Sequence, residues 1–413
     1  MSAGISKGHR VSFDDALAIV RHMARPLPSV EMPLQPAHGA VLAQDVVALA
    51  DYPRFDMSAM DGFALSSQST ETASDAAPLL IPINGQSVAG RAPVGPLGDG
   101  WTITTGAPIP PGCDTVLPRE RATIADLAGL LHLRLTSPLP VDANIRRRAE
   151  DAAAGETVAR SGQRVRAEMI GALRCCGVTQ VRVAEMPKVT VFSTGDELIG
   201  LDGSIIDEGV HDSNSSMIVA QVREAGAQAT LASQLPDDAA SIANAIRAMS
   251  AKRSHIIIST GGVSVGERDY VPAALEACGA TIHFHGVYMR PGKPVLFASL
   301  PDGTLFFGLP GNPVAAYLGF RFFAYAALRS MVGLAPEVGL EIELEAPRHA
   351  EVTSFLRVRS TFSSCGPRVE LLSEQQSHRM GPLLAANAWL AMPPQRDLSR
   401  KPIIYPLSCL GVR

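Results

Sequence analysis

One stretch, residues 255–269, constrains the fold more than any other, because an apolar run there stops at a glycine pair that hydroxyl and charged residues follow. The run contains Ile256, Ile257 and Ile258 in succession, with no polar residue between them. β-Branched residues without alternation are typical of a parallel strand that is buried on both faces. The stretch therefore predicts an interior strand of an α/β sheet that leads into a loop.

The loop after this strand has the composition of an anion-binding loop. Gly261 and Gly262 lack a Cβ, so their backbone can adopt positive φ and bring N–H groups close to an anion. Further small or hydroxyl-bearing residues surround the pair: Ser259, Thr260, Ser264 and Gly266. A plain surface turn would explain the same residues, and a glycine-rich loop alone does not decide between the two readings.

Two other apolar runs also end in polar loops. Residues 189–192 lead into Ser193, Thr194, Gly195, Asp196 and Glu197, and residues 305–307 lead into a loop that contains Pro310, Gly311, Asn312 and Pro313. Open α/β sheets bind their ligands at the carboxyl ends of the strands. The three loops are therefore predicted to form a site, and Pro313 is predicted to begin a helix over 314–328.

The rest of residues 187–332 alternates between helix and strand patterns. Asp212, Ser213 and Asn214 are N-cap candidates for one helix. Asp237 and Asp238 follow a strand, and Asp238 could either cap the next helix or serve the site. Residues 282–289 and 295–299 read as strands that flank a loop with Arg290 and Lys293. The alternation predicts a doubly wound, mostly parallel sheet.

Composition limits the class of protein. The chain has 413 residues, 46% of them hydrophobic and 18% charged, which predicts a globular protein with several domains. A net charge of −4 gives no electrostatic support for broad nucleic-acid binding. The six cysteines form no C-x-x-C pair and no zinc spacing, which fits a reducing cytoplasm. Neither a signal peptide nor a membrane span is expected, because no apolar run reaches about 18 residues.

The sequence predicts a multidomain α/β protein with four domains. Residues 1–52 and 140–186 form an α/β connecting domain, with helices at 11–23 and 167–175; residues 53–139 form a small inserted β domain, because short β-like runs alternate there with glycine and proline. Residues 187–332 form the central α/β domain. Residues 333–413, where apolar positions alternate, form a small C-terminal β-barrel domain.

Two polar features precede the central domain. Asp61 interrupts an apolar segment, so its carboxylate must be exposed, paired or functional, and by itself a solvated turn is the simplest explanation. Residues 144–151 carry three arginines and two acids, ending at Asp151, and a solvated charged turn explains such a run. Neither feature predicts a function without the rest of the chain.

Taken in order, these segments are specific to a family. They are 55–62, 105–108, 144–151, 193–197, 212–214, 260–269, 291–294 and 309–313. With this ordered set the chain resembles, nearly end to end, the bacterial molybdopterin molybdotransferases, whose relatives include the plant molybdenum-insertion domain and the matching domain of gephyrin. The loop 260–266 alone is also similar to that of molybdopterin adenylyltransferases.

The resemblance implies an elongated homodimer that takes adenylated molybdopterin and molybdate, uses a divalent cation such as magnesium, and releases molybdenum cofactor and AMP. It also implies a cleft between the central domain of one subunit and the inserted β domain of the other. The implied catalytic residues are Asp61, Thr105, Glu197, Asp269 and Lys293, and the implied metal ligands are Glu197, Asp237 and Asp269. Other proteins of molybdenum cofactor biosynthesis are candidate partners.

The implied substrate-binding residues are Asp151, Ser193, Thr194, Gly195, Asp212, Ser213, Asn214, Ser259, Thr260, Gly261, Gly262, Ser264, Gly266, Arg290, Pro310, Gly311, Asn312 and Pro313. Two positions depart from the family pattern. Arg290 stands where many relatives have lysine, which keeps the charge but offers a planar fork, and Ala315 stands where many have serine, which removes a hydroxyl from the implied molybdate site.

Two other functions stay open. A molybdopterin adenylyltransferase would share the central loop, but those proteins resemble only the α/β domain, and the matching segments before residue 155 argue against it. A scaffold or pterin-binding protein without catalytic activity would keep the fold, and the presence of Asp61, Glu197, Asp269 and Lys293 favours an enzyme instead.

Overall fold

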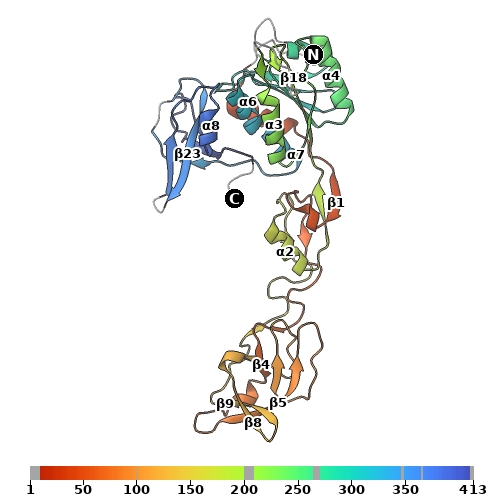
Figure 1. The fold of residues 1–413 in the computed structure, drawn as a ribbon, viewed down its shortest axis with the longest axis vertical. Helices are drawn as coiled ribbons and strands as arrows, with labels where there is room; N and C mark the ends of the chain where they lie inside the picture. Colours follow the sequence, from red (N-terminus) through yellow and green to blue (C-terminus); the bar gives the residue numbers. More distant parts are fainter. Residues whose placement is uncertain are drawn as a thin grey trace.

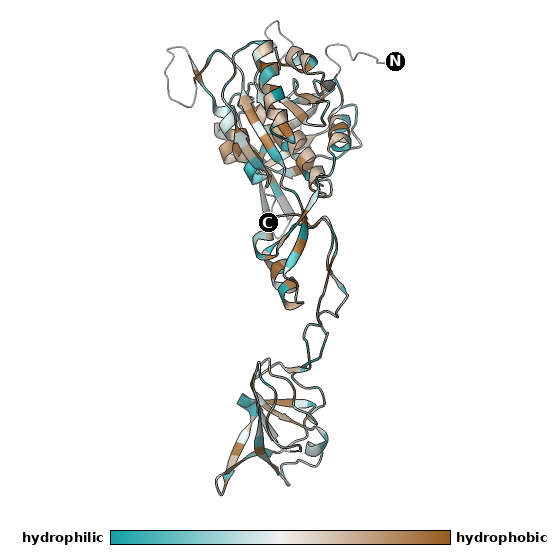
Figure 2. Ribbon diagram, turned by 90° about the vertical axis from the view of Figure 1, so that its right-hand side faces the viewer, coloured by the Kyte–Doolittle hydropathy of each residue, from teal (hydrophilic) through white to brown (hydrophobic). Residues whose placement is uncertain are grey.

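The computed structural model describes residues 10–98, 100–199, 209–263, 270–345, 348–363 and 366–409. The chain is elongated (Figure 1), with the central sheet and the C-terminal strands at one end, β4, β5, β8 and β9 at the other, and β1 and α2 between them. Figure 2 shows the same outline after a quarter turn. The structure is therefore a multidomain α/β protein, as predicted, and the four domain boundaries stay a prediction.

The central sheet has the order β16-β13-β17-β21-β20-β18. Its strands are β16 (Gln228–Leu231), β13 (Lys188–Ser193), β17 (Ile256–Thr260), β21 (Leu305–Leu309), β20 (Leu296–Ser299) and β18 (Thr281–His285). β16, β13, β17 and β21 pair in parallel, which confirms the mostly parallel sheet. β20 is antiparallel to both of its neighbours, β21 and β18, and the connection 300–304 between β20 and β21 is too short for a parallel crossover.

Helices cover both faces of this sheet. Ile256 and Ile258 of β17 belong to one core with α3 (Ser213–Glu224), whereas Ile257 belongs to a second core with α4 (Ala239–Ala251) and α5 (Tyr270–Ala277). All three isoleucines are fully buried. The unalternated apolar run therefore has the predicted cause, since successive side chains of one strand fill two different cores.

Three predicted helix starts are confirmed by capping bonds. Ser12 caps α1 (Phe13–Met23), where its hydroxyl accepts from the N–H of Asp15 at 3.1 Å. Asp212 caps α3 and accepts from the N–H of Ser215 at 3.0 Å, and Asp238 caps α4 and accepts from Ser241 at 2.7 Å. Side-chain acceptors at this position satisfy N–H groups that have no partner inside the helix.

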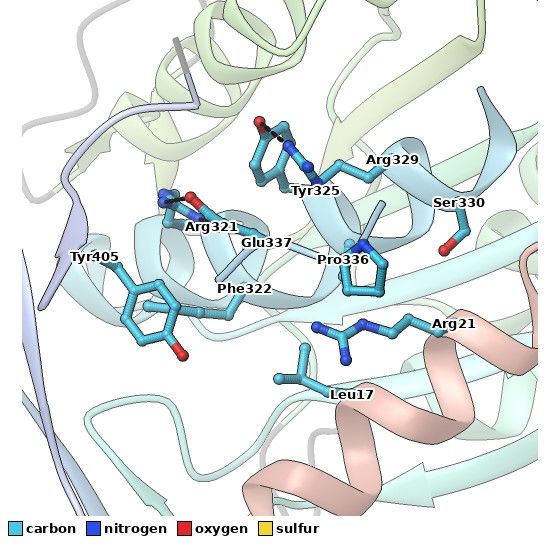
Figure 3. A pocket seen from close by; sticks show the side chains of 11 residues that line it. Leu17, Arg21, Arg321, Phe322, Tyr325, Arg329, Ser330, Pro336, Glu337 and Tyr405 are labelled. Atoms are coloured by element: carbon cyan, nitrogen blue, oxygen red, sulfur yellow. Dashed lines mark hydrogen bonds and ion pairs between the residues drawn. The ribbon is translucent and has the colours of Figure 1, made fainter. Parts of the chain in front are cut away.

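The helix after Pro313 differs from the uninterrupted one expected. It begins with Pro313 as α6 (Pro313–Gly319), passes through a π-helical segment, η4 (Phe320–Ala324), and continues as α7 (Tyr325–Met331). Arg321 in the π segment is buried, and its Nη1 and Nη2 each lie 2.7 Å from a carboxylate oxygen of Glu337 (Figure 3). Its Nε donates to the carbonyl of Pro406 at 3.1 Å, so this segment ties the central helices to the C-terminal strands.

Short strand pairs connect the central sheet to the far end of the molecule. β1 (Ser29–Pro33) pairs with β12 (Gln180–Ala184), β2 (Val46–Val47) with β11 (Thr157–Ala159), and β3 (Met57–Ser58) with β10 (Ile145–Arg146). The helix α2 (Ala167–Cys175) packs beside them, with a 3₁₀ turn at Gln35–Ala37. The chain thus passes twice between the two ends.

The distal sheet has the order β7-β4-β6-β5-β9-β8. Its strands are β7 (Thr115–Pro118), β4 (Gly62–Leu65), β6 (Gly100–Ile103), β5 (Leu79–Ser87), β9 (Leu130–Leu135) and β8 (Thr123–Leu127), with 3₁₀ turns at Gln68–Thr70 and Arg119–Arg121. Its largest fully buried side chain is Trp101. This region has only strands and 3₁₀ turns among its described elements, as the glycine and proline content predicts.

The C-terminal sheet has the order β19-β23-β25-β26-β22, and β24 pairs with β23. Its elements are β19 (Met289–Arg290), β22 (Leu340–Glu341), β23 (Thr353–Ser363), β24 (Gly366–Leu371), β25 (Ala388–Met392), β26 (Ile403–Pro406) and α8 (Gly381–Ala385). Among the described strands β19 and β22 do not pair, so the sheet is open and the expected barrel is wrong. The edge of β23 that faces away from β25 pairs instead with β19, which comes from the central region, and with β24.

Two remaining short strands, β14 (Leu198–Ile199) and β15 (Val210–His211), pair in parallel beside the central sheet. Within the described ranges, no helix is both long and apolar enough to cross a lipid bilayer.

Candidate functional site

The three predicted loops meet at one edge of the central sheet. Ser193 at the end of β13 is aligned with Thr260 of β17, and Thr260 is aligned with Leu309 of β21. Beyond the strands, the N–H of Thr194 donates to the carbonyl of Thr260 at 3.1 Å, and the N–H of Gly261 donates to that of Leu309 at 3.0 Å. The structure thus brings the loops after residues 193, 260 and 309 together, and substrate binding by them stays a prediction.

The glycine pair is required by its surroundings. Gly261 and Gly262 have φ of +89° and +65°, in the left-handed region. A Cβ on Gly261 would lie 2.6 Å from the carbonyl oxygen of Thr194, and one on Gly262 would lie 2.8 Å from the Thr194 hydroxyl. The backbone of the loop therefore packs directly on the neighbouring strand end, where no side chain at these two positions could fit.

Three buried polar atoms at this edge have no hydrogen-bond partner among the described residues. They are Oγ1 of Thr194, Oγ of Ser259 and Oδ1 of Asn214. The other amide atom of Asn214, Nδ2, donates to the carbonyl of Gly311 at 2.7 Å and so joins α3 to the loop before α6. Buried polar atoms without partners are costly, so this edge is suited to a polar ligand or ordered water.

The turn after β13 carries the exposed acid Glu197. Gly195 has φ of +143°, and a Cβ there would lie 2.7 Å from one carboxylate oxygen of Glu197. The Glu197 carboxylate is therefore folded back over Gly195, in space that only a glycine leaves open.

Gln234, which the sequence reading missed, holds this turn in place. Its Nε2 donates to the carbonyls of Gly195 at 2.9 Å and Leu198 at 3.1 Å. The N–H of Asp237 donates to Oδ1 of Asp196 at 3.3 Å, so the loop after β16 braces the acid turn twice. The available signal was the position of Gln234 immediately before the acidic loop 235–238, but a strand-end glutamine is too common to be specific.

The predicted metal ligands are only partly within the described chain. Asp269, Ser264 and Gly266 lie outside the described residues. Among the residues that are described, no three His, Cys, Asp or Glu side chains are grouped closely enough to hold a metal ion. Glu197 and Asp237 lie on adjacent braced loops and offer the carboxylate oxygens that Mg²⁺ prefers, so their chemistry fits a magnesium site.

The predicted cations lie where the central and C-terminal sheets join. Arg290 ends β19, which pairs in parallel with β23, and both Arg290 and Lys293 are exposed. The carbonyl of Lys293 accepts from the N–H of Val287 at 2.8 Å. Ala315 is buried in the first turn of α6, and Asn312, its N-cap residue, is exposed with its side chain unused for capping.

The distal sheet brings together Asp61 and Thr105. Oδ1 of Asp61 accepts from the backbone N–H of Thr105 at 2.6 Å and from its hydroxyl at 2.9 Å. These two bonds, the backbone one first, lower the pKa of Asp61 below its usual value. A Cβ on the next residue, Gly62, would lie 2.0 Å from the carbonyl oxygen of Leu117 in β7, so the first position of β4 requires glycine.

Asp151 belongs to neither group. It forms an ion pair with Arg146, which also pairs with Glu150 at 2.8 Å. The Arg146 guanidinium lies 5.4 Å from the ring centre of Tyr52, and the N–H of Asp151 donates to the carbonyl of that tyrosine. The other two arginines of the run are also paired, Arg147 with Asp56 and Asp142 and Arg148 with Asp51, so the run forms the paired charged turn that its composition predicts.

Within one chain the two groups of residues lie far apart. Figure 1 shows β4, which follows Asp61, at the end of the molecule opposite to α3 and α6, which flank the three loops. The structure therefore does not bring Asp61 and Thr105 to Glu197 in a single subunit.

Comparisons with known proteins cover most of the chain. Residues 11–177 match the family described as "MoeA N-terminal region (domain I and II)", and residues 190–330 match the "Probable molybdopterin binding domain". The fold is similar to a molybdopterin biosynthesis moeA protein of Pyrococcus horikoshii OT3, with a TM-score of 0.76, 25% identity, and 96% of this chain and 99% of that one covered.

Curated relatives agree with these matches. The molybdopterin molybdenumtransferase of Nostoc sp. is 35% identical over 303 residues, which cover 72% of this chain and 68% of the relative. That of Staphylococcus aureus (strain MRSA252) is 30% identical over 395 residues, which cover 94% and 93% of the two chains. Because the 30% identity with the Staphylococcus aureus protein extends over nearly the whole length of both chains, this chain belongs to the molybdopterin molybdenumtransferase family.

Proposed function

We propose that this protein inserts molybdenum from molybdate into adenylated molybdopterin and releases AMP and molybdenum cofactor. The observation that carries the proposal is the edge where three loops of a parallel sheet meet, in a chain of this family. Two buried hydroxyls there have no partner among the residues that the structure describes. A substrate with phosphate groups and polar ring atoms supplies the hydrogen-bond partners that such an edge needs.

Each group of side chains has a proposed role. The backbone of Gly261 and Gly262 and the hydroxyls of Ser259 and Thr194 bind the pterin phosphate. Arg290 and Lys293 neutralise phosphate or molybdate charge, for which Arg290 offers a planar fork. No protein nucleophile is required, because the dithiolene sulfurs of the substrate are the groups that bind molybdenum.

Magnesium dependence is part of the proposal. Glu197, Asp237 and Asp269 would hold the ion, which when bound would neutralise the pyrophosphate and favour the departure of AMP. Gly195 leaves the space into which the Glu197 carboxylate folds, and Gln234 fixes the turn that carries it. These two residues orient an oxygen ligand and do not touch the substrate themselves.

The proposed active unit is a homodimer with a shared cleft, in which Asp61 and Thr105 of one subunit face Glu197 of the other. The separation of the two groups in one chain supports this arrangement. A cytoplasmic location and contacts with other proteins of the same biosynthesis also belong to the proposal, and free cysteines among the described residues are consistent with a reducing compartment.

The test is single-turnover AMP release from adenylated molybdopterin with molybdate and Mg²⁺. We expect wild-type protein and Glu276→Gln, a matched loss of one exposed acid on α5, to release AMP, and Glu197→Gln to do so about 10²-fold more slowly. An adenylyltransferase would instead consume ATP and molybdopterin and release pyrophosphate. A protein without catalytic activity would bind the pterin and release neither product.

A further inference from the structure

A cavity lies away from the three loops, where the connecting region meets the central helices. Its volume is about 450 Å³. One wall comes from β1 and β12, through Val30, Met32 and Val183, and the other comes from the ends of α3 and α7, through Ala225 and Leu328. It contains none of the residues proposed for molybdenum insertion.

Three arginines, Arg164, Arg223 and Arg329, line this mostly apolar cavity. Arg164 donates through Nη1 to the carbonyl of Gly39 at 2.6 Å, and Arg329 donates to the Tyr325 hydroxyl at 3.2 Å (Figure 3) and to a backbone carbonyl. None of the three forms an ion pair with a carboxylate in the described part of the chain. The positive charge on the cavity wall therefore has only neutral partners there.

Three other titratable side chains line the cavity: Glu185, His38 and Tyr325. Glu185 lies 3.9 Å from Lys188, so its charge already has a basic neighbour outside the cavity. It is the cavity's one carboxylate among the lining residues, against three guanidinium groups.

The arginines oppose one another electrostatically. Partial burial lowers the pKa of Arg164, and the charges of Arg329 and Arg166 lower it further, although Tyr325 acts in the other direction. Like charges that are partly removed from water destabilise each other unless an opposite charge joins them. An anion in the cavity would relieve this repulsion while its remaining atoms contact the apolar wall.

We propose that this cavity binds an amphipathic organic anion, with an apolar body and a single carboxylate, sulfonate or phosphate head. The volume is within the range of about 300–1,000 Å³ that is typical of small-molecule sites. The apolar side chains of β1, β12 and α7 contact the body, and Arg164 with Arg329 binds the head. Because the two walls belong to different parts of the chain, the ligand holds them together.

Calorimetric titration of the full-length protein with a matched pair of probes tests this. Naphthalene-2-sulfonate carries the required charge on an apolar ring, and 2-naphthalenemethanol has a similar ring without it. We expect the sulfonate to bind at least ~10-fold more tightly than the alcohol, the scale of a charge-assisted hydrogen bond. Arg164→Gln should remove this preference, whereas Arg166→Gln, an exposed neighbour outside the cavity lining, should retain it.

A second variant guards against misfolding of Arg164→Gln. Val30→Trp fills the cavity from a strand position that is 42% exposed, and it should abolish binding of both probes while AMP release continues. Equal binding of the two probes, or an equal effect of Arg164→Gln and Arg166→Gln, would overturn the proposal. The proposal would also be overturned if the wild-type protein bound neither probe and Val30→Trp converted the dimer into a monomer, because the occupant of the cavity would then be a second subunit.

Discussion

Asp61 and Glu197, the two acids proposed to share one cleft, differ in how their carboxylates are held in position. Asp61 is held directly, because both hydrogen bonds from Thr105 end on one of its carboxylate oxygens. Glu197 forms no hydrogen bond through its carboxylate within the described chain, and its direction is set indirectly by Gly195 and by the clamp of Gln234 on the backbone. A directly bonded carboxylate suits a fixed orienting role, whereas one with free oxygens suits the binding of a cation.

The largest expected effect is the loss of AMP release when either acid is replaced, and mixed dimers test whether the two acids of one cleft come from different subunits. Asp61→Asn and Glu197→Gln should each lower AMP release about 10²-fold or more. Mixed dimers of the two variants, prepared by joint refolding, should recover about a quarter of wild-type activity, because half of the dimers are mixed and each of those has one intact cleft of two. The measurement is AMP release against the ratio of the two chains.

The matched control for this experiment mixes Glu197→Gln with Lys293→Ala. Both residues are proposed to come from the same subunit's side of the cleft, so every cleft in a mixed dimer has a defect and no recovery is expected. Recovery in the control, or no recovery with Asp61→Asn although native mass spectrometry detects mixed dimers, would contradict the shared cleft.

A smaller effect on activity is expected at Gln234, whose side-chain amide holds the turn that carries Glu197. Gln234→Leu removes both donors to the turn, so we expect the Mg²⁺ concentration for half-maximal activity to rise by about 10-fold, the scale of losing a group that orients a metal ligand. Mn²⁺ titration followed by electron paramagnetic resonance checks the binding without turnover. Gln228→Leu, at an exposed position of the preceding strand β16, is the control. Unchanged Mn²⁺ affinity with a lower melting temperature would mean that Gln234 only stabilises the fold.

The smallest effect concerns pH and Asp61. Its folded-state pKa is lowered below the usual 3.8, so it contributes stability above that pH and the contribution is lost as the pH falls through the lowered value. Thr105→Val keeps the backbone donor but removes the hydroxyl, so the melting temperature should fall less steeply with acid than in wild type, and Asp61→Asn should flatten it further. Identical acid profiles for all three proteins would show that the Thr105 bonds do not stabilise the carboxylate.

Features that depend on near neighbours in the sequence could be predicted. Ser12, Asp212 and Asp238 cap their helices through residues three positions ahead, so the pattern alone indicates them. The meeting of three loops also follows from sequence, because parallel strands present the same end at the same edge. The apolar run Ile256, Ile257 and Ile258 predicts the buried strand whose end lies at that edge.

Features that depend on distant contacts could not be predicted with the same rules. The clamp by Gln234 requires knowing that β16 lies beside β13, and the open C-terminal sheet depends on an edge strand from residues 289–290. The antiparallel direction of β20, by contrast, can be predicted from the sequence, because the connection 300–304 to β21 is too short for a parallel crossover. The 450 Å³ cavity lies between regions that are separate in sequence, so no local pattern marks it.

The π-helical segment Phe320–Ala324 has a consequence in terms of insertions and deletions. A π turn holds one residue more than an α turn, so it is equivalent to a single-residue insertion in an α-helix. Deleting one residue there would convert the π turn into an α turn and leave the orientation of α7 unchanged, whereas deleting one residue within α7 would rotate everything after it by about 100° around the helix axis. Leu328 and Arg329 would therefore keep their place on the cavity wall after a deletion in the π segment and would lose it after a deletion at 325–327, so the π segment is the one place in this helix where chain length can change without moving the cavity wall.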